Sequence, residues 1–260
     1  MKKISVLILL SLIFNTQPAN AVDVLPQPFF DYLGSKYLAN PGIILLDGSS
    51  KEIVYESGST ILRSPASVLK LTSATAVAMT LDSTTVFTTS LYKTEKRGVF
   101  VILGENDPWM TSSAKYRDAN KRAYTPTLIK KAFATDKKLK KITLLYRGVS
   151  GGELYKAKRA LGRRASVVYK ALDKNIDPKS LITEKVVEIQ SPQLIKMIKF
   201  ALLYSDNVLT QRLAMLATTK SGYAADKNGL NEMMNEKLTA LGVDTTGLHL
   251  EDGSGLSGGN

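Results

Sequence analysis

Ser67 and Lys70 are the residues whose types and spacing best suit nucleophilic chemistry in this 260-residue sequence. A serine hydroxyl is a weak nucleophile at neutral pH and needs an adjacent base. Residues three apart on a helix share one face, so the two side chains can touch. A lysine accepts a proton only when neutral, and the apolar neighbours Val68, Leu69 and Leu71 would lower its pKa. We therefore interpret Ser67 as a nucleophile and Lys70 as its general base.

The pair alone is a weak signal, because the same spacing arises by chance on ordinary helices. A second polar group, Ser205-Asp206-Asn207, strengthens it by interrupting the apolar helical pattern of residues 191–217. These residue types favour caps and turns over helix interiors. We expect Ser205 to relay a proton between Lys70 and a leaving amine, and Asn207 to hold a substrate amide and orient the lysine. An ordinary helix cap is the alternative interpretation.

The sequence also predicts the elements that would position these groups. Residues 64–81 predict a buried helix, with Ser64 as its cap and Pro65 at its first position. Residues 42–48 and 51–58 alternate like strands on either side of a short polar turn, which predicts a β-hairpin.

The rest of the chain divides into a basic middle and a helical end. Strand patterns occur at 85–94, 97–104 and 141–149, with lysine-rich helical pieces among them. Helical patterns return at 191–217 and 227–243. Two apolar helical regions thus flank a mixed segment, which suggests a core domain whose chain is interrupted by an insertion.

The first 21 residues have the pattern of a secretory signal peptide. A basic start, an apolar run at 4–14 that is too short to span a bilayer, and small residues at Ala19 and Ala21 fit a cleaved leader. An uncleaved membrane anchor is the alternative. We therefore expect an exported, extracytoplasmic protein in the periplasm or cell wall. The absence of cysteine means that it would use no disulfides there.

The formal net charge is +12, and removal of Lys2 and Lys3 with the leader lowers it to +10. Much of the excess lies between residues 115 and 170. Nucleic-acid binding is not favoured, because no aromatic stacking motif accompanies the charge. Two interpretations of the basic residues remain. They form either a solvated face or a face that contacts an anionic polymer of the envelope. The second interpretation would allow peripheral association with the envelope.

Four segments, in order, resemble the serine-acylating D-alanyl-D-alanine carboxypeptidases and endopeptidases, the class C low-molecular-mass penicillin-binding proteins. They contain the Ser67–Lys70 pair, a segment ending in Asp107-Pro108 that resembles the family's Leu-x-Gly-x-x-Asp-Pro strand-turn, the Ser205-Asp206-Asn207 group and an Asp-Gly-Ser-Gly-Leu-Ser stretch. Their ranges are 61–78, 99–110, 191–214 and 241–260. The resemblance covers most of the chain that follows the leader.

The resemblance implies that Ser67 is acylated, that Lys70 is its general base, and that Ser205 and Asn207 complete the proton relay and the substrate contacts. The backbone N–H of Ser67 would form half of an oxyanion hole. The substrate would be a peptidoglycan stem peptide, at its terminal D-Ala-D-Ala or at a cross-bridge, and β-lactams would acylate Ser67 as covalent inhibitors. No cofactor or metal is implied.

The implied fold is α+β, with a helical cluster beside an antiparallel sheet and an inserted mixed α/β domain. We expect a signal peptide at 1–21, core segments at 22–84 and 186–260, and the insertion at 85–185. The transpeptidase-like core would be incomplete.

The family's third motif, Lys-Thr-Gly, is not found in these 260 residues. Lys220-Ser221-Gly222 is no substitute, because it precedes the Asp-Gly-Ser-Gly stretch and has no strand pattern around it. We expect the sequence to be a fragment of a longer gene product. A catalytically impaired, peptidoglycan-binding relative is the alternative, and a serine esterase or β-lactamase-like hydrolase is a second one.

Overall fold

The computed structural model describes residues 25–161 and 166–257, so the predicted leader lies outside the described residues. The described residues form two compact units, which divide between Arg63 and Ser64. Across the described residues we find no helix with the length and hydrophobicity that a membrane span requires.

The first unit contains the predicted hairpin. Strands β1 (Ile43–Leu46) and β2 (Ile53–Ser57) pair antiparallel, which confirms that prediction. Asp47 shapes the turn, because its carboxylate accepts hydrogen bonds from the backbone N–H groups of Ser49 and Ser50. Helix α1 (Gln27–Leu33) packs Phe29 and Phe30 edge-on against Tyr55 of β2.

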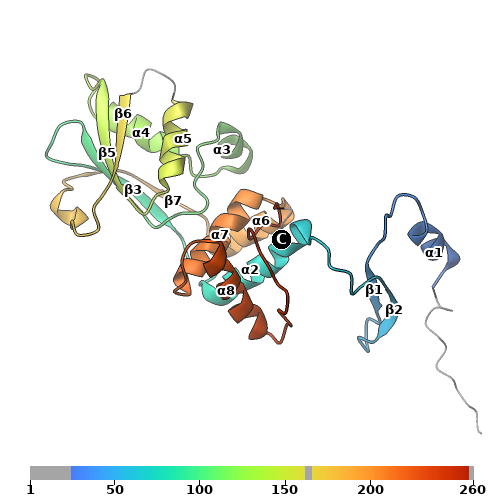
Figure 1. The fold of residues 1–260 in the computed structure, drawn as a ribbon. Helices are drawn as coiled ribbons and strands as arrows, with labels where there is room; N and C mark the ends of the chain where they lie inside the picture. Colours follow the sequence, from blue (N-terminus) through green and yellow to red (C-terminus); the bar gives the residue numbers. More distant parts are fainter. Residues whose placement is uncertain (1–24, 162–165, 258–260) are drawn as a thin grey trace, which may run out of the picture. The chain divides into compact units, whose positions relative to one another are not determined.

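A cluster of four helices forms one half of the second unit (Figure 1). Its members are α2 (Leu69–Thr80), α6 (Leu194–Leu203), α7 (Asn207–Lys220) and α8 (Lys227–Thr239). Fully buried side chains from all four share one core, among them Ala76, Met197, Leu209 and Met233. The polar break within 191–217 and the helix near 227–243 are therefore confirmed.

The other half of the second unit is a five-stranded mixed sheet in the order β6-β5-β4-β3-β7. Strand β3 pairs antiparallel with β4 and β7, whereas β5 pairs parallel with β4 and β6. The bounds are β3 (Thr88–Lys93), β4 (Val99–Gly104), β5 (Lys141–Arg147), β6 (Ser166–Ala171) and β7 (Lys185–Gln190). The three predicted strands are present, and β6 and β7 are additional.

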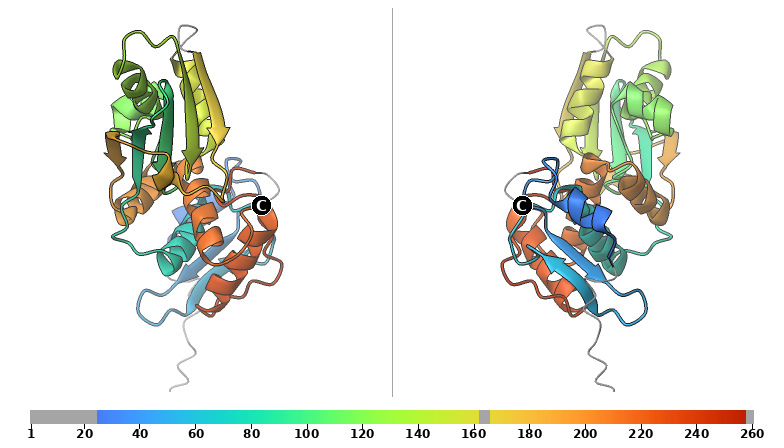
Figure 2. Two further views of the ribbon diagram at one scale, coloured as in Figure 1. Left: turned by 90° about the vertical axis from the view of Figure 1, so that its left-hand side faces the viewer. Right: turned by 90° about the vertical axis from the view of Figure 1, so that its right-hand side faces the viewer.

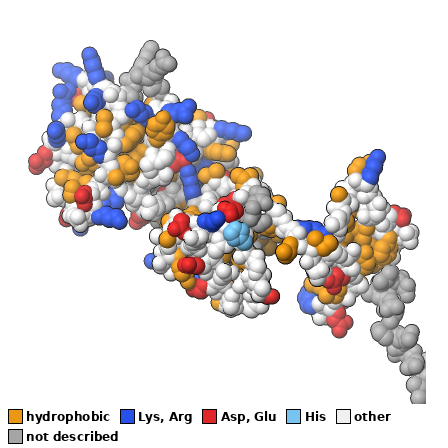
Figure 3. All heavy atoms as spheres, viewed as in Figure 1, with side chains coloured by type: hydrophobic (Ala, Val, Ile, Leu, Met, Phe, Trp, Pro, Cys, Tyr) orange, Lys and Arg blue, Asp and Glu red, His pale blue; other side chains and the backbone are white. Residues whose placement is uncertain are grey.

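Helices α4 (Thr125–Ala134) and α5 (Gly151–Ala160) cover one face of this sheet and share its core (Figure 2). Shorter pieces complete the unit: α3 (Ala114–Asn120) and the 3₁₀ turns η2 (Ala66–Val68) and η3 (Pro178–Ser180). Lys and Arg side chains are spread over the surface of this half (Figure 3). The α+β class is confirmed, and the domain boundaries predicted from sequence stay a prediction.

The helix predicted at 64–81 begins later than expected. A 3₁₀ turn occupies Ala66–Val68, and the α-helix starts at Leu69 without a side-chain cap from Ser64. The physical reason is Ala66, whose φ of 47° is left-handed and cannot continue a right-handed helix. The helix is buried on one face only, since Leu71 is 61% exposed.

Two arginines join the sheet half to the helical cluster. Arg122 stacks over the Trp109 ring and forms a buried ion pair with Asp206, whose oxygen lies 2.9 Å from its Nη1. Arg212 of α7 pairs with Glu153 of α5 and donates to the Met110 carbonyl. These contacts fix the loop that contains residues 105–112 against the start of α7.

Asp107 in this loop provides a test of the packing. Its pKa is raised to about 6, mainly by burial, against the lowering effects of the Trp109 N–H and of Arg122 and Arg212. The unfolded carboxyl titrates near 3.9, so the folded state binds more protons between about pH 4 and 6, and stability falls as pH rises through that window. Asp107→Asn should therefore raise the free energy of unfolding by about 1–3 kcal/mol at pH 7, and by less at pH 4, in urea titrations.

Asp118→Asn is the matched control, because that carboxylate is exposed and its ion pair is with the adjacent Arg117. It should change stability little at either pH. A loss of stability in Asp107→Asn that is equal at pH 4 and pH 7 would contradict the burial argument.

Candidate active site

Ser67 and Lys70 are in direct contact. The Lys70 Nζ lies 2.8 Å from the Ser67 Oγ. Ser67 is in the 3₁₀ turn η2 and exposed, whereas Lys70 is the second residue of α2 and only 2% exposed. The three-residue spacing thus brings the amine to the hydroxyl even though the turn is not α-helical.

The pKa of Lys70 is lowered from the ordinary lysine value, chiefly by burial, while the negative charges of Asp252 and Asp206 act in the opposite direction. Of the three apolar neighbours expected to surround it, only Leu69 is buried. Val68 and Leu71 are mostly exposed, because they lie on the solvent face of the helix. Val68 and Leu71 therefore do not account for the burial of Lys70, whose amine contacts the Ser67 hydroxyl and the Ser254 carbonyl.

Ser205 approaches Ser67 from the other side. Its Oγ donates a hydrogen bond of 2.9 Å to the Ser67 Oγ. Ser205 has a left-handed φ of 51° in the connection between α6 and α7. Asp206 is the N-cap of α7, accepting a hydrogen bond from the Leu209 N–H, while its other oxygen pairs with Arg122. The helix cap proposed as the alternative interpretation is thus present at Asp206, and the hydroxyl that contacts Ser67 belongs to the adjacent Ser205.

Asn207 is the first residue of α7 and is half-buried. Within the described part of the chain, its side-chain amide has no hydrogen-bond partner. The structure therefore brings three of the four predicted site residues together, Ser67, Lys70 and Ser205. Asn207 follows Ser205 by two positions but makes no side-chain hydrogen bond to them. The roles of all four stay predictions.

The segment Asp252–Ser257 lies against the buried side of this group. The sequence placed it among the four family-like segments but assigned it no contact with Lys70. The Ser254 carbonyl accepts a hydrogen bond of 2.7 Å from the Lys70 Nζ, and the Gly253 carbonyl accepts one from the Ser73 Oγ. Asp252 holds the segment in shape by accepting from several of its N–H groups, including that of Gly255. The available signal was the run of Asp, Gly and Ser, which favours a turn folded around the aspartate.

Gly255 fixes the position of the nucleophile's turn. Its φ is +75°, and a Cβ at this position would lie 1.7 Å from the Ala66 carbonyl oxygen. Only glycine allows so close an approach of the two backbones. The turn that presents Ser67 is therefore packed directly against the segment that accepts the Lys70 hydrogen bond.

The arrangement suits proton transfer at a serine hydroxyl. The Ser67 Oγ is contacted by an amine of lowered pKa and by a second hydroxyl, which is the geometry required to activate a nucleophile and to pass its proton onward. Among the described residues, no group of three or more His, Cys, Asp or Glu side chains is arranged to hold a metal ion. Ser67 and Ser205 are both exposed, so the site is an open one.

Comparisons with known proteins bear on the family and the fold. Residues 173–260 match the family model of the D-Ala-D-Ala carboxypeptidase 3 (S13) family. No curated protein sequence matches the chain.

Two solved structures share the fold. One is penicillin-binding protein 4 (dacB) from Haemophilus influenzae, with a TM-score of 0.57 and 13% identity over 84% of this chain and 71% of that one. The other is the same protein complexed with a β-lactam, with a TM-score of 0.56 and 12% identity over 83% and 70%. At these identities the likeness establishes the fold. The resemblance to the low-molecular-mass penicillin-binding proteins is thus confirmed, by sequence over residues 173–260 and by fold over most of the chain.

Proposed function

We propose that this protein is a serine-type D-alanyl-D-alanine carboxypeptidase or endopeptidase that acts on peptidoglycan stem peptides through an acyl-enzyme at Ser67. The observation that carries the proposal is the contact of the Ser67 Oγ with both the Lys70 Nζ and the Ser205 Oγ. The S13 family match over residues 173–260 supports the substrate class.

In the acylation step, the Ser67 Oγ attacks the carbonyl carbon of the penultimate D-Ala while its proton passes to neutral Lys70. The backbone N–H of Ser67 donates a hydrogen bond to the oxyanion that forms. The C–N bond then breaks, and the leaving D-Ala amine takes the proton from Lys70 by way of the Ser205 hydroxyl. Water hydrolyses the ester by the reverse proton path, and Asn207 holds the substrate amide.

β-Lactams enter by the same route. Their strained amide presents a carbonyl to Ser67, and opening of the ring leaves the acyl group attached to the serine. The complex of the Haemophilus influenzae protein with a β-lactam supports this assignment. The protein would act outside the cytoplasm, where peptidoglycan lies, with peripheral association to the envelope.

The exposure of Ser67 favours one alternative, a peptidoglycan-binding relative of impaired catalysis. Electrostatic stabilisation of an oxyanion is strongest where water is excluded. The side chains of Ser67 and Ser205 instead lie at the surface. This alternative predicts binding of muropeptides without an acyl-enzyme.

The first prediction is covalent labelling of the chain by a fluorescent penicillin. Because Ser67 is the proposed nucleophile, one label per molecule should form, and mass spectrometry of the digest should place it on Ser67. Ser67→Ala should abolish labelling. Ser205→Ala should slow it by about 10²–10⁴-fold, the usual contribution of a proton-transfer group.

Ser64→Ala is the matched control, since this serine is exposed, lies in the same segment and is outside the contact group. It should label like the unaltered protein. Labelling that persists in Ser67→Ala would exclude the proposed nucleophile. Muropeptide binding by an unlabelled chain would establish the alternative.

The second prediction concerns the pH dependence of acylation. Burial lowers the pKa of Lys70, and only the neutral amine accepts the Ser67 proton. The labelling rate should therefore rise with pH and level off at a midpoint below about 10.4, the value of an ordinary lysine. Stopped-flow or quenched labelling between pH 6 and 10 measures it.

Ser67→Ala provides the correction for spontaneous β-lactam hydrolysis in alkaline buffer. Lys70→Met should remove the pH-dependent limb, whereas Lys220→Met, a surface change at the end of α7, should leave it intact. A rate that is flat with pH, or unchanged in Lys70→Met, would show that Lys70 is not the base.

A further inference from the structure

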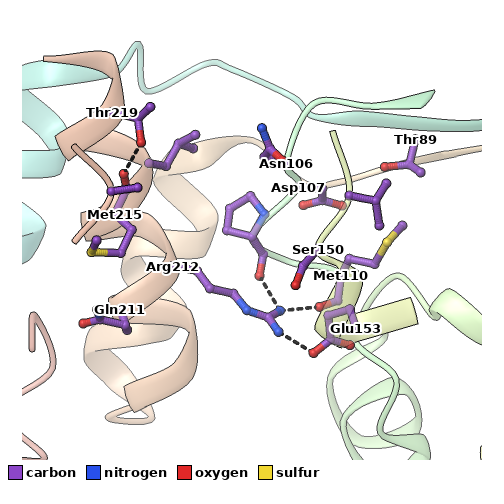
Figure 4. A pocket seen from close by; sticks show the side chains of 14 residues that line it. Thr89, Asn106, Asp107, Met110, Ser150, Glu153, Gln211, Arg212, Met215 and Thr219 are labelled. Carbon is purple, nitrogen blue, oxygen red and sulfur yellow. Dashed lines mark hydrogen bonds and ion pairs between the residues drawn. The ribbon is translucent and has the colours of Figure 1, made fainter. Parts of the chain in front are cut away.

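A cavity of about 470 Å³ lies on the opposite part of α7 from the Ser205 end. One side is formed by α7 residues, including Met215 and Thr219, and the other by the loops that contain Asp107 and Ser150 (Figure 4). Ser67, Lys70 and Ser205 do not line it. Its volume is in the range of sites that bind small molecules.

Two buried polar atoms at this cavity have no hydrogen-bond partner among the described residues: the Oδ2 of Asp107 and the Oγ1 of Thr89. Asp107 is 9% exposed and Thr89 is 1% exposed, and both line the cavity. A buried acceptor that is left unpaired costs free energy, and the cost is greatest for a charged one. A ligand that donates hydrogen bonds to these two oxygens would remove this cost.

The neighbouring charged groups already have partners. Arg212 reaches across the cavity to Glu153 and to the Met110 carbonyl (Figure 4). Glu153 also accepts a hydrogen bond from the Ser112 Oγ, and Arg122 is paired with Asp206. The Asp107 carboxylate forms no ion pair within the described residues, and its Oδ2 accepts no hydrogen bond there.

Much of the remaining wall is apolar. Pro108, Met110, Val149, Met215 and Leu216 contribute hydrocarbon and thioether surface. A ligand that fits must therefore combine a donor-rich, positively charged end with an apolar stem. An acid would meet an unpaired carboxylate, and a purely apolar molecule would leave it unpaired.

We propose that this cavity is a second binding site, separate from Ser67, for a small molecule with a primary ammonium group on an apolar stem, the ammonium donating to Asp107 Oδ2 and Thr89 Oγ1. The stem lies along Met110, Met215 and Leu216. Nothing in this assignment depends on acyl transfer, because neither anchoring residue touches Ser67, Lys70 or Ser205.

The test is a titration of the whole chain with n-hexylammonium by calorimetry, together with NMR shifts of the methionine methyl groups of Met110 and Met215. n-Hexanol and hexanoate are the probes of equal length without the positive charge. Hexylammonium should bind at least about tenfold more tightly than n-hexanol or hexanoate, because only the ammonium forms a charge-assisted hydrogen bond with the Asp107 carboxylate. Equal binding of hexanol would overturn the proposal.

Asp107→Asn keeps the shape of the side chain and should weaken hexylammonium binding by about tenfold or more. Thr89→Val should weaken it by less, because it removes a neutral acceptor. Asp118→Asn and Ser67→Ala should bind like the unaltered chain. A melting curve for each variant separates loss of the site from loss of the fold, and unchanged affinity in a folded Asp107→Asn would refute the assignment.

The pH dependence supplies an independent readout. Glu105 from the same loop, Arg122, Arg212 of α7 and Glu153 of α5 are the charged groups around Asp107. With its pKa near 6, the carboxyl is protonated at pH 5 and ionised at pH 7. Hexylammonium should therefore bind about tenfold more weakly at pH 5 than at pH 7, and this difference should disappear in Asp107→Asn. Persistence of the difference in that variant would contradict the proposal.

Discussion

The buried ion pair between Arg122 and Asp206 is the interaction on which the arrangement of the second unit depends. Arg122 is supplied by the segment before α4, stacks on Trp109 and donates to the carbonyls of the same loop. Asp206 caps α7 and is covalently adjacent to Ser205. This pair thus links the segment before α4 to the N-cap of α7, directly after Ser205. Removal of one partner from such a pair leaves a buried charge, which typically costs about 3–5 kcal/mol.

The environment of Lys70 shows how the same fold lowers the pKa of an amine without isolating it. Burial disfavours the ammonium form and lowers the pKa, whereas the charges of Asp252 and Asp206 favour the ammonium form. The amine also donates a hydrogen bond to the Ser254 carbonyl. The effect of burial is the larger one, so the pKa of Lys70 is lowered. The neutral amine therefore forms at less alkaline pH than it does in a surface lysine. The carbonyl also orients the amine toward Ser67, because it fixes one of the three N–H directions.

Much of the site followed from local sequence rules. A three-residue spacing placed Ser67 beside Lys70, and a polar break in an apolar pattern located Ser205. The hairpin, the three clear strands and the helical cluster followed from periodicity. Strands β6 and β7 did not, because charged residues within them and lysines in the flanking sequence obscure the strand pattern. The 3₁₀ turn was also missed, since an alanine at position 66 gives no sign of a left-handed φ.

What local rules could not supply is pairing over long separations. The Arg122–Asp206 pair joins residues 84 positions apart, and the Lys70–Ser254 contact spans 184. The local sequence around each of these residues gives no indication of which distant residue it contacts. The same holds for the cavity beside α7, whose walls come from four separate parts of the chain.

The close packing of Gly255 against Ala66 has a consequence for the order in which the molecule assembles. Contacts between residues so far apart in sequence require closure of nearly the whole second unit, and such closures are slow steps in folding. During synthesis, the turn that bears Ser67 emerges long before the glycine that shapes it. The contact between Ser67 and Lys70 therefore forms late in folding. A partly synthesised chain contains Ser67, but the pKa of its Lys70 is not yet lowered by the folded surroundings.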